Sequence, residues 1–173
     1  MPHMNLEFKD RLILSNQYRI LAVLYPNEAD SFRGAQKVVE NGYELNYDWI
    51  SEHISPQPMS DEHCREVLDI LEMFRHLGYA YDALEDKTEI DEHHIRFLGF
   101  DGNNEGAYLS YADYIINDTG RYQESKNAGD NLNSHMPTIA MYRRMLRAWE
   151  PLRDKHPLEK EDIQQIVAAR VHP

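Results

Sequence analysis

The 173-residue sequence contains little cysteine, glycine or proline, and it has no long apolar run. Its single cysteine, Cys64, excludes an internal disulfide and a four-cysteine zinc site. No stretch reaches the roughly 18 consecutive apolar residues of a membrane-spanning helix, and the start has no signal-peptide pattern. We therefore expect a cytoplasmic protein that is neither exported nor inserted in a membrane.

Basic residues are also scarce, with 18 Lys and Arg against 30 Asp and Glu, for a formal net charge of -12. A field of this sign repels the phosphates of nucleic acids and the surfaces of anionic lipids. Nucleic acid could bind only through a local basic patch. The one dense basic cluster consists of Arg143, Arg144 and Arg147.

No linker rich in proline, glycine or serine divides the chain into two halves, so we expect a single domain. The opening Met1-Pro2-His3-Met4 resembles a vector-derived leader, which leaves residues 5–173 as the folded domain. The remaining composition is typical of a globular protein with room for long helices.

Apolar residues recur with the helical period along most of the chain. The pattern predicts one helix over residues 6–25 and a second over 28–41, which ends at Gly42 as a left-handed cap. Ser60 is expected to cap a long amphipathic helix that reaches at least Leu77.

The second half of the chain is less regular. Further helices are expected at 47–54, after the turn at residues 101–105, after Pro137, and at 158–171. An Asn of that turn is expected to cap its helix, and Pro137 is expected to occupy a first helical position. We predict an all-α bundle of about six to eight helices, which allows one short extended segment near Phe97.

Asp101, Asn103, Glu105 and Gly106 fit the first positions of a calcium-binding loop. Ala112 stands where the bidentate carboxylate is needed, so the oxygen cage is incomplete.

The adjacent His93 and His94 project about 100 degrees apart on a helix and cannot easily share one metal ion. The sequence also lacks the phosphate-binding loop, the dinucleotide fingerprint and the nucleophile elbow. We expect no metal ion, no cofactor and no catalytic residue.

If the protein has a ligand site, two irregular segments are the best place for it. Residues 99–105 and 120–136 bracket one helix, and their polar side chains can converge. The candidate ligand-binding residues of these segments and of the next helix are Asp101, Asn103, Glu105, Arg121, His135, Tyr142 and Arg143. The alternative is structural, with Arg121 pairing to Asp101 or Glu105 to fix the loop.

Asn16 and Gln17 complete the candidate set, because Gln17 falls between Ile13 and Ile20 on the apolar side of the first helix. A buried amide must find hydrogen-bond partners. A bond to a neighbouring helix or loop is the favoured interpretation, and contact with a ligand is the alternative.

Several short motifs together make the sequence similar to a known family. They are Arg11-Leu-Ile-Leu-Ser-Asn-Gln-Tyr18, Leu68-Asp-Ile-Leu-Glu-Met73, Phe97-Leu-Gly-Phe-Asp101, Gly120-Arg-Tyr122 and Tyr142-Arg-Arg-Met145. The chain resembles the YfbU-like family of bacterial helical proteins, whose activity is not assigned. The resemblance implies an all-α bacterial protein and transfers no catalytic residue.

Three hypotheses of function follow. The absence of catalytic motifs and the Tyr- and Met-rich helices favour a non-enzymatic regulatory or protein-interaction protein that forms a homodimer. The second hypothesis is a nucleic-acid-binding regulator that uses Arg143, Arg144 and Arg147. The third is an enzyme with a polar site near Asp101, Glu105 and Arg121.

Overall fold

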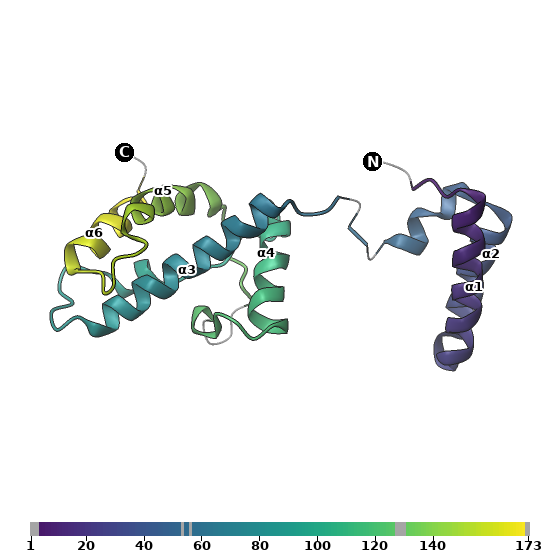
Figure 1. The fold of residues 1–173 in the computed structure, drawn as a ribbon, viewed down its shortest axis with the longest axis horizontal. Coiled ribbons are helices and arrows are strands. Elements are labelled where there is room, and N and C mark those ends of the chain that lie inside the picture. Colours follow the sequence, from purple (N-terminus) through teal and green to yellow (C-terminus); the bar gives the residue numbers. More distant parts are fainter. Residues whose placement is uncertain (1–3, 53, 56, 127–130, 172–173) are drawn as a thin grey trace. The chain divides into compact units, whose positions relative to one another are not determined.

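The computed structural model describes residues 4–52, 54–55, 57–126 and 131–171. These residues form helices and connecting segments without a β-strand, which confirms the all-α prediction (Figure 1). The chain divides into two compact units, Met1–Pro58 and Met59–Pro173, so the expectation of a single domain stays a prediction. Of the expected leader, only Met4 is among the described residues.

The N-terminal unit is a helical hairpin in which α1 (Phe8–Leu24) and α2 (Ala29–Asn41) lie side by side (Figure 1). A capping box starts α1, in which the backbone N–H of Glu7 donates to Asp10 at 3.0 Å. The 3₁₀ turn Pro26–Glu28 then reverses the chain. Both predicted helices are present, with ends shifted by one or two residues.

Gly42 ends α2 with φ of 67°, the left-handed conformation that the sequence predicts. The short helix expected at 47–54 is instead two 3₁₀ turns, Glu44–Asn46 and Asp48–Ser51. Pro56, which follows this segment, lies outside the described residues.

The C-terminal unit is built around α3 (Asp61–Ala83), whose first turn is closed by Ser60. The Ser60 hydroxyl accepts a hydrogen bond from the His63 backbone at 3.2 Å, as the sequence predicts. The helix continues past Gly78 to Ala83, which is more than one further turn. Its core-facing side chains are Val67, Ile70, Leu71, Met73, Phe74, Leu77 and Ala80.

Three later helices pack against α3. Figure 1 shows α4 (Gly106–Asp113) crossing the first half of α3, with α5 (Ile139–Trp149) and α6 (Lys160–Ala168) along the rest of it. A π-helical turn, Tyr114–Asp118, extends α4 and ends before Gly120, as expected.

Two predicted helix starts are wrong. Pro137 precedes the cap residue Thr138, and α5 begins at Ile139 instead. An asparagine was expected to cap α4, but Glu105 occupies the cap position and makes no side-chain cap bond there. Its carboxylate is used elsewhere, as described below.

The extended segment expected near Phe97 is present as one isolated bridge between Phe100 and Asn133. Among the described residues, no helix is both long and apolar enough to span a bilayer.

Candidate functional site

Glu105 is buried and its carboxylate is saturated with hydrogen bonds. Oε1 accepts from the backbone N–H groups of Thr138 at 2.8 Å and Ile139 at 2.9 Å. Oε2 accepts from the backbone N–H of Asp101 at 3.0 Å and lies 3.0 Å from the Thr138 hydroxyl. Since both oxygens are occupied by the protein's own donors, this carboxylate is a structural group.

These bonds give α5 the N-terminal cap that its own sequence lacks. The first N–H groups of a helix have no partner inside it, and the helix dipole favours a negative charge at that end. Glu105 supplies both acceptor atoms and charge from the start of α4. It therefore ties α4 to α5.

Tyr142 belongs to the same buried cluster. Its hydroxyl accepts from the Leu98 N–H at 3.1 Å and donates to the Gly99 carbonyl at 3.0 Å. Burial raises the pKa of the Tyr142 phenol well above its usual value. Gly99 is required here, because its φ is 86° and an added Cβ would lie 2.0 Å from the Leu132 carbonyl oxygen.

The structure brings Asp101, Glu105 and Tyr142 together but does not pair them with Arg121. Arg121 is exposed, and its guanidinium lies 5.3 Å from the ring centre of Tyr122. The predicted tie between Arg121 and a carboxylate is therefore wrong. Backbone N–H groups, the Asn104 side chain and the Thr138 hydroxyl already bind the oxygens that an arginine would need.

Two further candidates of this region, Asn103 and His135, are exposed. The Asn103 backbone donates to Asp101 at 3.1 Å, within the turn that precedes α4. The His135 backbone has a φ of 55° and donates to the Asn133 side chain at 2.9 Å. Their roles in binding a ligand stay predictions.

The arginine cluster is largely engaged inside the molecule. Arg143 binds both carboxylate oxygens of Glu66, at 2.6 and 2.9 Å, which lowers the pKa of Glu66. Arg144 donates to the carbonyls of Ala140 and Ala169 at 3.1 and 3.0 Å. Within the described residues, Arg147 is the one arginine of this cluster that is exposed and has no hydrogen bond or ion pair.

The prediction that Gln17 is buried is also wrong, since Asn16 and Gln17 are both exposed. The buried polar residue of α1 is Ser15, whose hydroxyl donates to Glu40 of α2 at 2.8 Å. The helix packs on α2 through the face that contains Ser15 and the half-buried Tyr18. Gln17 and its apolar neighbours therefore point outward.

As a result, α1 exposes a second apolar surface, which we call the α1 outer face. The exposed fractions of its residues range from 46% at Ile13 to 76% at Val23. The face consists of Leu12, Ile13, Ile20, Val23 and Leu24.

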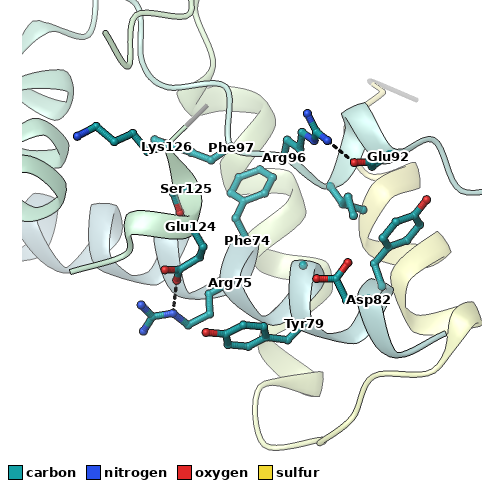
Figure 2. A pocket seen from close by; sticks show the side chains of 13 residues that line it. Phe74, Arg75, Tyr79, Asp82, Glu92, Arg96, Phe97, Glu124, Ser125 and Lys126 are labelled. Atoms are coloured by element: carbon teal, nitrogen blue, oxygen red, sulfur yellow. Dashed lines mark hydrogen bonds and ion pairs between the residues drawn. The ribbon is translucent and has the colours of Figure 1, made fainter. Parts of the chain in front are cut away.

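A cavity of about 390 Å³, here called the Gly78 pocket, opens beside α3 (Figure 2). The 3₁₀ turn Glu92–Ile95 with the segment after it, and the 3₁₀ turn Gln123–Ser125, form its other walls. No motif of the sequence predicts this pocket. The available signal was a glycine inside an otherwise strongly helical pattern.

A pair of histidines lies at another place on α3. The Trp149 indole N–H donates to Nδ1 of His76 at 3.0 Å, and the His156 ring centre is 4.2 Å from that of His76. Burial and the nearby His156 lower the pKa of His76. Within the described residues, no group of three or more His, Cys, Asp or Glu side chains is placed to hold a metal ion.

A family model, the YfbU domain, matches residues 4–169 of the chain. The chain belongs to the YfbU family. The match extends over both compact units, so the N-terminal hairpin and the unit around α3 are parts of one YfbU domain. The family resemblance noted in the sequence is thereby confirmed, and the function of this YfbU domain has to be argued from its surfaces.

Proposed function

We propose that this protein is a non-enzymatic interaction protein that forms a homodimer through the α1 outer face. The observation that carries the proposal is the exposure of five large apolar side chains on one face of one helix. Contiguous exposed apolar surface of this kind usually marks a site of protein association. Its burial would contribute roughly 25 cal/mol for each Å² removed from water.

A second copy of the chain is the partner that suits this face best. Leu12 and Leu24 stand at equal distances in sequence from Tyr18, and so do Ile13 and Val23. A two-fold axis at the level of Tyr18 would pack the two α1 helices in opposite directions, with Leu12 of one protomer opposite Leu24 of its partner and Ile13 opposite Val23.

The charges at the two ends of α1 support the same arrangement. Lys9 lies at the start of the helix and Glu28 lies just after its end, and both are exposed. Two antiparallel copies would place each lysine near the partner's glutamate. Complementary charges of this kind favour the symmetric register over a shifted one.

Ile20→Lys tests the proposal, because it introduces a charge into the middle of the α1 outer face. Light scattering at tens of micromolar should give a dimer mass for the unaltered protein and a monomer mass for Ile20→Lys. The far-ultraviolet circular dichroism spectrum should be unchanged, since position 20 is exposed in the hairpin.

Ser110→Lys is the matched control, since it adds the same charge at an exposed position of α4. It should leave the dimer mass intact. A monomer mass for the unaltered protein, or a dimer mass for Ile20→Lys, would reject the proposal.

The other two hypotheses rank below this one. Nucleic-acid binding would have to rely on Arg147, because Arg143 and Arg144 already bind Glu66 and backbone carbonyls. An enzyme site at Asp101 and Glu105 would need free carboxylate oxygens, whereas those of Glu105 already accept from the backbone at the start of α5 and at Asp101. We also propose a cytoplasmic, bacterial protein, in keeping with its single cysteine and its family.

A further inference from the structure

Gly78 occupies the interior of α3, a helix of 23 residues, although glycine is a poor helix former. The backbone there is ordinary helix, so no left-handed conformation requires it. A Cβ added at Gly78 would meet no other atom within 4 Å. Neither backbone strain nor close packing explains this glycine. Its effect is to leave open the side of α3 that lines the Gly78 pocket.

The charges around the pocket leave one carboxylate uncompensated. Arg75 pairs with Glu124, and Arg96 pairs with Glu92 on the opposite wall (Figure 2). Asp82 is one helical turn beyond Gly78, and within the described residues it has no hydrogen-bond or ion-pair partner.

Lys126 is the remaining cation of the lining, and in Figure 2 its side chain extends away from the other labelled residues. The pocket therefore presents a free negative charge at Asp82. The net charge of -12 adds a long-range attraction for cations.

Aromatic rings line the same pocket. Phe74 and Phe97 belong to the buried core behind the pocket, while Tyr79 and Tyr81 are closer to solvent. Lys87 already places its ammonium nitrogen 4.6 Å from the ring centre of Tyr81, a cation–π contact at this edge of the pocket. A carboxylate and aromatic rings that line one pocket are a combination that recognises organic ammonium groups.

We propose that the Gly78 pocket binds a small organic cation, an amine or amidine with an apolar body. The cationic group pairs with the Asp82 carboxylate. The apolar body lies over Gly78, where a larger side chain would exclude it. The cavity of about 390 Å³ is within the range of small-molecule sites.

The test uses the full chain with two probes of equal size and opposite charge, benzylammonium and benzoate. Titration followed by nuclear magnetic resonance shift changes should show saturable binding of benzylammonium at up to about 10 mM, and weaker binding of benzoate. Preference for benzoate would indicate an anion site at Lys126 and would overturn the proposal, as would no binding of either probe.

Asp82→Asn removes the charge with little change of shape at an exposed position. It should weaken benzylammonium binding at least about tenfold. The matched control is Glu85→Gln, which removes a carboxylate outside the pocket lining and should leave binding unchanged. Equal binding by the Asp82→Asn variant and the unaltered protein would overturn the proposal.

Gly78→Ala separates a ligand role for the glycine from a structural one. The methyl group meets no atom of the chain, so the better helix former should raise Tm by about 2 to 4 °C. Benzylammonium binding should fall at least about tenfold in the same variant. A higher Tm with undiminished benzylammonium binding would show that the ligand does not lie over Gly78, and it would overturn this part of the proposal. The Ile20→Lys variant should bind the probe normally, so this test is independent of the proposed dimer.

Discussion

The Glu105 side chain stabilises the start of a helix to which it does not belong. It accepts hydrogen bonds from the first N–H groups of α5 and also holds the turn at Asp101. Charged acceptors of buried backbone donors contribute more than neutral ones. The residue is therefore a better target for a stability measurement than for an activity measurement.

Glu105→Ala should lower the free energy of unfolding by about 3 kcal/mol, because it leaves several buried N–H groups without a partner. Arg121→Ala should change it by less than about 0.5 kcal/mol, because Arg121 is exposed and pairs with no carboxylate. Urea unfolding of both variants checks this pair of expectations. A larger effect at Arg121 than at Glu105 would show that the loop is held differently.

His76 should make the stability of the protein depend on pH. Burial lowers its pKa in the folded state, and the Trp149 indole donates to the nitrogen that a proton would occupy. The titratable groups near His76 are His156 and Glu72. The unfolded chain binds this proton at about pH 6.5, the ordinary histidine pKa, whereas the folded chain binds it only at lower pH.

The contribution of neutral His76 to the free energy of unfolding is therefore fully present above about pH 6.5. It is lost as the pH falls towards the folded-state pKa of His76. His76→Gln keeps an acceptor for Trp149 and removes the titration. Thermal unfolding between pH 8 and pH 5 should show a smaller loss of Tm for this variant than for the unaltered protein. His135→Gln, at an exposed position, should follow the unaltered protein. The same loss of Tm between pH 8 and pH 5 for all three proteins would contradict the role of His76.

Among the elements, α3 starts through a purely local interaction. The Ser60 hydroxyl accepts from the His63 backbone, and acidic residues follow in the first turn. Ser60→Ala should therefore lower the free energy of unfolding by about 1 kcal/mol. Ser60→Asp, which keeps an acceptor, should restore most of the loss in the same urea experiment.

The difference between α3 and α5 explains how much of the fold the sequence predicts. The start of α3 depends on a serine adjacent to the helix, so the pattern of residues identifies it. The start of α5 depends on Glu105, which is distant in sequence, and the local pattern instead points to Pro137. Helix propensity and apolar periodicity carry no information about contacts between residues that are distant in sequence.

The packing face of α1 shows a second limit. Ile13, Ile20 and Leu24 form one apolar stripe, while Leu14, Tyr18 and Leu21 form another. Both have helical spacing, so periodicity alone does not tell which one contacts α2. In the structure the second stripe packs inward, and this choice also determines that Gln17 is exposed.

The candidate site was harder still to predict. Asp101, Glu105 and Tyr142 do gather in one place, whereas Arg121 of the second irregular segment does not join them. Their polar atoms are used for folding, because a buried carboxylate and a buried phenol must be satisfied. The Gly78 pocket joins α3 to residues after Tyr122, and no local motif marks such a junction.

At the scale of the whole molecule, the proposed dimer should link stability to concentration. Because association stabilises the folded chain and not the unfolded one, Tm rises with protein concentration by mass action. Scanning calorimetry from about 5 to 500 micromolar should therefore show an increasing Tm for the unaltered protein. Ile20→Lys should have a Tm that is independent of concentration. A constant Tm for both would count against the dimer.

The arrangement around α3 also has a consequence for synthesis. The chain leaves the ribosome with its N-terminus first, and α3 precedes all three helices that cover it. Its apolar side chains therefore emerge well before α5 and α6 exist. The Glu105 carboxylate must likewise wait for the N–H groups of Thr138 and Ile139. We therefore expect the apolar face of α3 to need chaperones most when synthesis has just passed the end of this helix.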